Sequence, residues 1–205
     1  MAVRRAVIAA IMGQFGPPGG AAGRVAGWVM AHRRSNRQRN SWVVSLLEVQ
    51  PTENVLEIGF GPGLAIAELS RRAGEQGHVY GIDHSDVMLR QATRRNAAAI
   101  VAGRVTLRRA SVDQLPPALG GRFDAILAVN SLGLWPAQLA EPRCPGATAS
   151  TSRAAARKIE ALLQGAGYTK TRTQTLGLNP PVVCVLAVNP DPDRGRSPPA
   201  SDPTS

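Results

Sequence analysis

Three glycines at alternate positions follow a short apolar segment, Val55 to Ile58, and carry the clearest chemical signal in the chain. They are Gly59, Gly61 and Gly63, and a helix is predicted to begin at Leu64. Glycine lets the backbone turn tightly here and lets a ligand touch the main chain. The amino terminus of the following helix adds a partial positive charge that suits a carboxylate. The segment therefore predicts a ligand-binding turn between a strand and a helix.

Glu57, inside the preceding strand, distinguishes two classes of ligand for this turn. A dinucleotide site requires Gly-x-Gly-x-x-Gly, and Leu64 stands at the third glycine position of that pattern. A carboxylate two residues before the first glycine would also repel a pyrophosphate. It suits a ligand with an ammonium and a sulfonium group, as in S-adenosylmethionine. A tight turn without a ligand is the alternative for the glycines taken alone.

Two further carboxylates stand where such a ligand needs them. Asp83 ends the second predicted strand, where an acid can accept both ribose hydroxyls. Asp113 follows the third predicted strand and is placed to accept the adenine amino group. Taken singly, Asp83 could be a helix cap and Asp113 a loop acid. We expect them to act together, because the carboxyl ends of parallel strands converge on one crevice.

With these residues in this order, the chain resembles the class I S-adenosylmethionine-dependent methyltransferases, most of all their small-molecule, ubiquinone/menaquinone-type bacterial branch. The resemblance covers about residues 41–130 and 153–188. By this resemblance, the methionine moiety would be surrounded by Glu57, Gly59, Gly61 and Gly63. Asp83 would bind the ribose, and His84 would lie near the adenine or the ribose. Asp113 and the Val112 backbone would contact the adenine, and Asn130 would lie near the transferred methyl group. The resemblance implies cofactor contacts from Glu57, Gly59, Gly61, Gly63, Asp83, His84, Val112, Asp113 and Asn130.

Strands and helices alternate after Pro51, which predicts an α/β fold with a doubly wound, mostly parallel sheet of the Rossmann-like methyltransferase type. The strands are predicted at residues 54–58, 77–83, 105–109, 123–130, 168–176 and 182–188. The helices between them are predicted at residues 64–73, 85–102 and 152–166.

The predicted domains are an N-terminal helical arm or cap, residues 1–50, and an S-adenosylmethionine-binding domain, residues 51–189. The arm has predicted helices at residues 24–32 and 36–48, and Ala6 to Met12 is predicted as a helix or a mobile arm. Residues 190–205 are rich in Pro, Ser and Asp and are predicted to be a disordered tail.

The segment after the fourth predicted strand departs from the family pattern. The family sheet has the strand order 3-2-1-4-5-7-6, and a helix and a fifth strand follow strand four. In this chain Pro136, Pro142 and Pro145 exclude a long helix or a central strand there. Strand five is therefore predicted to be missing. Val182–Val188 is predicted to pair directly with strand four in a six-stranded sheet.

No residue stands out as a catalytic base. Methyl transfer needs mainly alignment of the reacting atoms and exclusion of water, because the sulfonium is already activated. His84 is the nearest candidate base, although a half-exposed histidine beside the ribose is the simpler interpretation. His32, Trp28, Met30 and Trp42 could line the acceptor pocket, although large apolar residues at helical spacing more often belong to the core.

Composition limits the class of partner. The net charge is +10, and the first 40 residues hold seven arginines and no acid. Only two of the 24 basic residues are lysine, which is typical of a GC-rich bacterial genome and offers an explanation without an anionic partner. Aromatic residues make up 4% of the chain, which argues against a stacking surface for nucleic acid. No apolar run is long enough to span a bilayer, and no metal-ligand spacing surrounds Cys144 or Cys184.

We therefore expect a cytoplasmic methyltransferase with a small-molecule acceptor. A nucleic-acid methyltransferase is one alternative. Amino-methylating enzymes of that kind carry Asn/Asp-Pro-Pro-aromatic after strand four, where this chain has Asn130-Ser131-Leu132-Gly133. Asn179-Pro180-Pro181 lacks the aromatic and is predicted to be a hairpin turn. A degenerate binder of S-adenosylmethionine without catalysis is the other alternative, which the missing strand supports.

Overall fold

A computed structural model describes residues 3–10, 34–111, 123–129, 149–178 and 182–188. The elements, in chain order, are β1 (Val3–Ala10), α2 (Arg34–Leu47), β2 (Asn54–Ile58), α3 (Leu64–Arg72), β3 (His78–Asp83), α4 (Asp86–Arg95), α5 (Ala97–Val101), β4 (Val105–Arg109), β5 (Phe123–Val129), α6 (Ala149–Gly165), β6 (Thr169–Leu176) and β7 (Val182–Val188).

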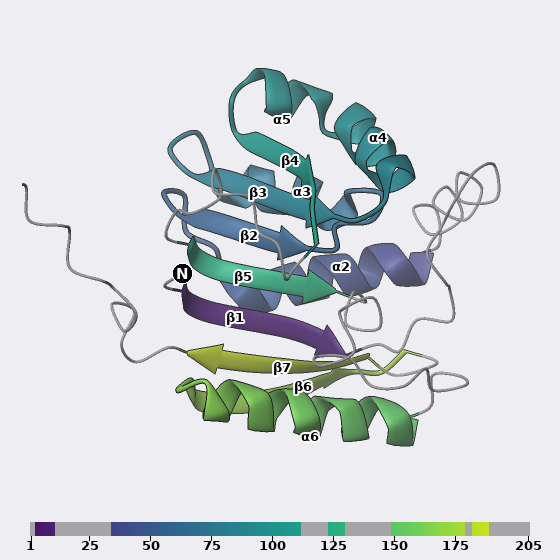
Figure 1. Cartoon of the computed structure of the whole chain (residues 1–205), viewed down its shortest axis with the longest axis vertical. Coiled ribbons are helices and arrows are strands. Elements are labelled where there is room, and N and C mark those ends of the chain that lie inside the picture. Colours follow the sequence, from purple (N-terminus) through teal and green to yellow (C-terminus); the bar gives the residue numbers. More distant parts are fainter. Residues whose placement is uncertain (1–2, 11–33, 112–122, 130–148, 179–181, 189–205) are drawn as a thin grey trace, which may run out of the picture.

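The described strands form one seven-stranded sheet in the order β4-β3-β2-β5-β1-β7-β6 (Figure 1). The pairs from β4 through to β1 are parallel. Strand β7 is antiparallel to both of its neighbours, β1 and β6. A mostly parallel sheet with helices between its strands confirms the predicted α/β class.

Most predicted elements are found within a few residues of their expected bounds. The central strands are short apolar runs bounded by polar or glycine residues, which is typical of strands buried on both faces. The helix predicted at residues 85–102 is divided into α4 and α5 at Asn96. The helix predicted at residues 24–32 and the Asn179-Pro180-Pro181 turn lie outside the described residues.

The prediction for the first residues was wrong, because Val3–Ala10 is a strand and not a helix or a mobile arm. This strand, β1, runs parallel to β5, with Val7 opposite Leu127. It runs antiparallel to β7, with Val7 opposite Leu186. Strand β1 therefore occupies the place of strand five in the family order.

The six-stranded sheet was also wrong. Strand β7 does not pair with β5, because β1 lies between them and forms a ladder with each. An apolar strand such as β5 is costly as an open edge, and β1 supplies the missing backbone partners. Residues 130–148, where the family's own fifth strand was expected to be absent, lie outside the described residues.

Helices cover both faces of the sheet. Helices α2 to α5 share one buried cluster, with Val43, Ile66 and Met88 packed against the sheet at Leu127. Helix α6 covers the other face, where Ile159 belongs to a second buried cluster. These two layers bury the strands between them, so that the strand ends are the natural place for a ligand.

The segment formed by α6, β6 and β7, here called the C-terminal unit, joins the rest of the sheet through β1. Figure 1 shows β7 and α6 below β1, and β5, β2, β3 and β4 above it. Within the described residues, no helix has the length and apolar character needed to cross a membrane.

Candidate functional site

The turn between β2 and α3 has the backbone conformation that its glycines predict. Gly59, Gly61 and Gly63 all have positive φ angles, of 75°, 53° and 77°. A Cβ on Gly63 would lie 2.7 Å from Asn96 Nδ2, so this position is closed by packing. A Cβ on Gly61 would meet nothing within 4 Å. The backbone at Gly61 is therefore bare and open, which is what close approach of a ligand requires.

Two residues from the end of α4 hold the other side of this turn. Asn96 is buried, and its side-chain amide donates to the carbonyl oxygens of Gly63, at 3.2 Å, and Ala92, at 2.9 Å. Arg95 Nε donates to the carbonyl oxygen of Pro62 at 2.9 Å. Sequence reasoning missed both residues. An Arg-Asn pair at the end of a helix gives no local signal for a partner that is distant along the chain.

Asp83 connects the end of β3 to the turn. Its Oδ2 accepts a hydrogen bond from the backbone N–H of Gly61 at 2.9 Å, and its Oδ1 accepts one from Ser85 N–H at 2.8 Å. Burial raises the pKa of the Asp83 carboxyl, while the N–H groups of Ser85 and Gly61 and the neighbouring His84 act in the opposite direction. The structure thus brings Asp83 and the glycine turn together, two parts of the site that the sequence analysis placed at the same edge of the sheet.

Glu57 lies in β2 beneath the same turn and is fully buried. Burial, and then the charge of Asp83, raise the pKa of the Glu57 carboxyl well above its ordinary value, although a hydrogen bond from the Ile66 backbone opposes this shift. Its Oε2 is buried without a hydrogen-bond partner. A buried carboxyl in this state is more stable as the neutral acid unless a cation lies nearby.

The other predicted site residues are placed only in part. His84 Nδ1 lies 3.6 Å from Asp83 Oδ1, and its side chain is 40% exposed. Trp42 is partly buried against the core, as the simpler interpretation of it predicts. The remaining predicted site and pocket residues lie outside the described residues: Val112, Asp113, Asn130, Trp28, Met30 and His32.

The glycine turn, the Asp83 carboxylate and the amino terminus of α3 thus meet at the carboxyl edge of the parallel strands. This edge joins backbone N–H donors, an open glycine and a hydrogen-bonded carboxylate. Such a set can hold a ligand that has both hydroxyl donors and charged groups. Among the described residues, no cluster of His, Cys, Asp and Glu could hold a metal ion.

Comparison with known proteins agrees with this geometry. The profile of a family described as "Methyltransferase domain" matches residues 55–142. The "uncharacterized methyltransferase YdaC" of Bacillus subtilis (strain 168) is 27% identical over 187 residues, which cover 81% of this chain and 98% of YdaC. Shorter matches include methyltransferases whose names give small-molecule and RNA acceptors, so the matches do not decide the acceptor class.

Solved structures show the same fold. A SAM-dependent methyltransferase from Aquifex aeolicus has a TM-score of 0.60 at 16% identity, covering 81% of this chain and 98% of that one. The O-methyltransferase TomG from Streptomyces achromogenes, involved in tomaymycin synthesis and solved in complex with SAM, has a TM-score of 0.56 at 19% identity, covering 74% of this chain and 79% of that one. By the family match over residues 55–142, the similarity to YdaC and the fold, the chain is similar to the class I S-adenosylmethionine-dependent methyltransferases.

Proposed function

We propose that the enzyme transfers the methyl group of S-adenosylmethionine to a small-molecule acceptor by in-line displacement, with the cofactor bound over the turn from Gly59 to Gly63. One observation carries this placement. The N–H of Gly61 lies 2.9 Å from Asp83 Oδ2, and the space beside Gly61 is open. The Asp83 carboxylate at the end of β3 and the open backbone of Gly61 in the β2–α3 turn therefore lie side by side, where one ligand could contact both.

The residues present suit this cofactor. Each oxygen of a carboxylate has two acceptor sites, so Asp83 can accept from ribose hydroxyls while it keeps its bonds to Gly61 and Ser85. The Glu57 carboxyl, whose Oε2 has no hydrogen-bond partner, lies behind the turn, and a bound cation would lower its raised pKa and favour the ionised form. Val112, Asp113 and Asn130 stay predictions for the adenine and methyl ends.

The cofactor supplies an activated methyl group on a sulfonium. The residues of the chain have to orient the acceptor and exclude water, and a base is needed only for an acceptor of high pKa. His84 is the candidate for such a base among the described residues, because it is next to Asp83 and half-exposed.

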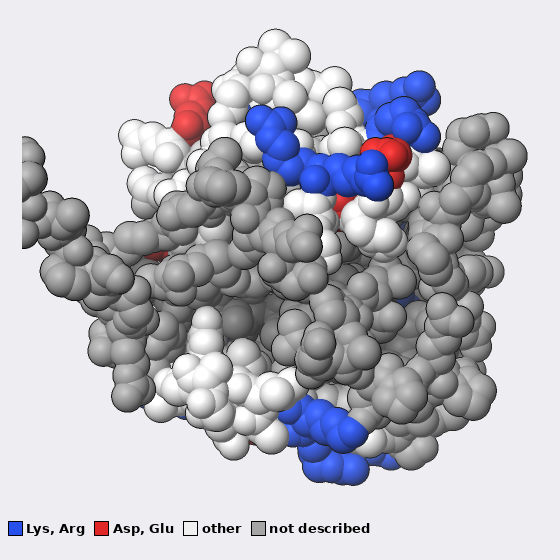
Figure 2. All heavy atoms as spheres, in the orientation of Figure 1, with Lys and Arg blue, Asp and Glu red and all other residues white. Residues whose placement is uncertain are grey.

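A small-molecule acceptor is favoured over nucleic acid by the surface of the described residues. On the face shown in Figure 2, Lys and Arg side chains occur in separate groups, over α4 and β4 and over α6, and acidic side chains lie beside the upper group. The upper basic group is thus partly offset by acidic side chains, whereas a nucleic-acid surface is predominantly positive. The name of TomG associates the same fold with a small-molecule pathway.

Calorimetric titration with S-adenosylmethionine and S-adenosylhomocysteine tests the cofactor site. We expect micromolar binding that is abolished by Asp83→Ala. Asp83→Asn should weaken binding by about 10- to 100-fold, because hydrogen bonds to a charged group contribute about 1.5–3 kcal/mol. Asp86→Asn is the matched control, since it removes the same charge three residues later, at an exposed ion pair with Arg109. Unchanged binding in Asp83→Ala would refute the placement.

Methyl transfer from radiolabelled S-adenosylmethionine tests the acceptor class. The enzyme is incubated separately with a bacterial metabolite extract and with total RNA and DNA from the same cells. We expect label in the low-molecular-weight fraction. Label only in the nucleic-acid fractions would overturn the small-molecule proposal and leave the cofactor site intact.

A further inference from the structure

Arg39 is a partly buried arginine on α2. Val43 and Leu47 are buried, and Arg39 precedes Val43 by four residues, so helical spacing places it on the same stripe of the helix. Its Nη1 donates to Asn36 Oδ1 at 2.9 Å. Its Nε is buried and has no hydrogen-bond partner. Arg39 is therefore held in place at one edge of its guanidinium, while a donor on the other edge is unused.

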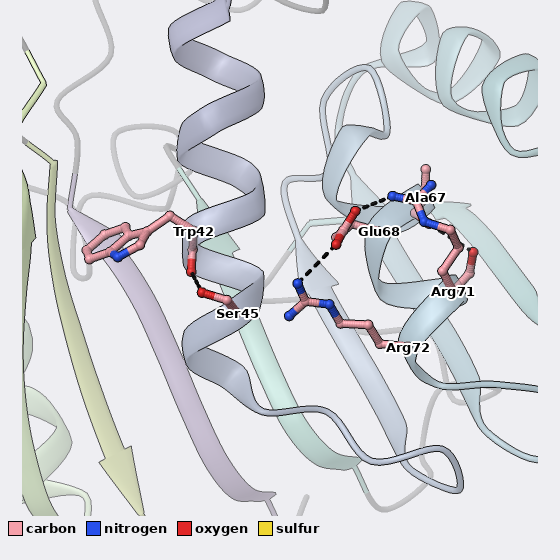
Figure 3. Close-up of polar contacts among 7 residues, drawn as sticks. Trp42, Ser45, Ala67, Glu68, Arg71 and Arg72 are labelled. Atoms are coloured by element: carbon pink, nitrogen blue, oxygen red, sulfur yellow. Dashed lines mark hydrogen bonds and ion pairs between the residues drawn. The ribbon is translucent and has the colours of Figure 1, made fainter.

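The guanidinium of Arg39 has no carboxylate partner within the described part of the chain. The first turn of α2 contains no acidic residue. The nearby α3 carries Glu68, but this carboxylate already pairs with Arg71 and Arg72 on its own helix (Figure 3). Burial lowers the pKa of Arg39, in agreement with a charge that has lost water without gaining a counter-ion. Charges that are withdrawn from water are normally paired, so an anion from outside the chain would stabilise this partly buried guanidinium.

The direction of helix α2 indicates at which end of the sheet Arg39 lies. Helix α2 is joined to β2 by a short connection, so it runs antiparallel to the strand and begins at the carboxyl edge of the sheet. Figure 1 shows α2 extending past the arrowheads of β2 and β5. Strand β5 ends at Val129, next to the position predicted to lie near the transferred methyl group. The amino-terminal half of α2, which carries Arg39, therefore lies toward the carboxyl edge of the sheet, where the acceptor is expected to bind.

We propose that Arg39 binds an oxyanion of the acceptor, so that the acceptor is an anionic small molecule with a carboxylate or phosphate group. The inference rests on the proposed function. The edge formed by Nε and Nη2 presents two parallel N–H donors, which match two oxygens of such a group. Because Asn36 holds Nη1, this edge is the one available for a bidentate contact. Lysine could not replace it, since its ammonium is a single point charge.

Nuclear magnetic resonance of the arginine Nε–Hε groups tests the inference in the full chain. The enzyme is saturated with S-adenosylhomocysteine and titrated with sodium acetate and, separately, inorganic phosphate, at constant ionic strength set with chloride. The Arg39 signal is assigned by its loss in Arg39→Lys. We expect a saturable shift of this signal with at least one of the two anions, while the signal of exposed Arg37 changes only weakly.

Variants distinguish a specific anion-binding site at Arg39 from nonspecific electrostatic attraction of anions. Arg39→Gln should abolish saturable anion binding by calorimetry. Arg39→Lys should weaken it by about tenfold or more, because one bidentate contact is lost. Arg37→Gln, which removes a neighbouring charge, should leave it unchanged. Equal affinity in Arg39→Gln and the original protein, or no saturable shift of the Arg39 signal, would overturn the inference.

S-adenosylhomocysteine affinity, measured on the same samples, distinguishes this inference from the proposed function. Normal, Asp83-dependent cofactor binding without anion binding would overturn only the role of Arg39. If the original protein does not bind the cofactor product at all, the proposed site fails and the inference fails with it.

Discussion

Glu57 and Asp83 are two carboxyl groups that share one buried environment under the glycine turn. The pKa of each is raised mainly by burial, and the charge of Asp83 adds to the shift at Glu57. An acid whose pKa is higher in the folded than in the unfolded state binds more protons when folded. Its contribution to stability is therefore present at low pH and is lost as the pH rises through the folded pKa.

This sign gives a prediction for Glu57→Gln, which keeps the shape of the side chain and cannot ionise. The original protein should lose stability as the pH rises above about 4.5, the ordinary pKa of the group, and the variant should lose less. Each unit of raised pKa corresponds to about 1.4 kcal/mol. Urea denaturation between pH 4 and 8 measures the difference.

Glu75→Gln, at an exposed position, is the control and should follow the original protein at every pH. Parallel stability curves for Glu57→Gln and the original protein would contradict the assignment of a raised pKa to Glu57. The same variant also reports on the cofactor. If a bound cation favours the ionised form of Glu57, Glu57→Gln should bind S-adenosylmethionine more weakly.

In the β2–α3 turn, we expect one glycine to contribute mainly to stability and another to ligand binding. Gly63 lies against Asn96 and Ala92, whereas Gly61 has open space beside it. Both have positive φ angles, which cost an alanine about 1–2 kcal/mol. The two glycines thus share a backbone conformation but differ in packing, because only Gly63 has close neighbours.

We expect Gly63→Ala to lower the free energy of unfolding by more than about 2 kcal/mol, because a contact under 3.0 Å adds to the backbone cost. Gly61→Ala should cost about 1–2 kcal/mol and should weaken S-adenosylhomocysteine binding by about tenfold or more, because its methyl group would occupy the open space. Urea denaturation and calorimetry on both variants measure the two effects. Cofactor binding by Gly61→Ala as tight as in the original protein would place the ligand elsewhere.

Local pattern was sufficient for most elements. Apolar runs with glycine or polar ends located β2, β4 and β7. The proximity of Asp83 to the turn is consistent with the expected convergence of the strand ends at one edge of the sheet. Local sequence pattern could not predict the role of Asn96, because this role depends on a hydrogen bond to Gly63, which is distant along the chain. Local sequence pattern also could not predict β1 as a strand. Val3–Ala10 is an apolar run with two arginines, which is compatible with a helix as well as a strand.

At the scale of the whole molecule, β1 explains how the sheet is complete despite the departure after strand four. Its partners, β5 and β7, have no ladder with each other. The C-terminal unit therefore depends on β1 for its place in the sheet. The family order contains no strand from the amino-terminal end of the chain at this place in the sheet, so the replacement could not be predicted from that order.

A proline in β1 tests this dependence. Val7 lies opposite Leu127 and Leu186, so Val7→Pro removes a ladder donor in the middle of the sheet. Cys184 in β7 lies opposite Ala9, and burial raises the pKa of its thiol to about 12. In a Cys144→Ser background we expect Cys184 to be almost unreactive toward a thiol reagent and Val7→Pro to increase its labelling rate by about tenfold or more.

Val3→Pro, at the first position of the strand, is the matched control, because proline is tolerated there. It should leave the labelling rate of Cys184 nearly unchanged, and far-UV circular dichroism should show that both variants keep their helices. Equal labelling of Cys184 in Val7→Pro and Val3→Pro would mean that β1 does not hold β7 in place.

The central place of β1 also has a consequence for synthesis of the chain on the ribosome. Val3 pairs with Phe123 and Ala6 with Ala187, so the strand is made long before either partner exists. During this interval it is an unpaired apolar segment, which is the kind of segment that associates with other chains. Arg4 and Arg5 give it two positive charges, and charges in such segments oppose aggregation. The sheet can close only when β7 emerges, so its completion waits for nearly the whole chain.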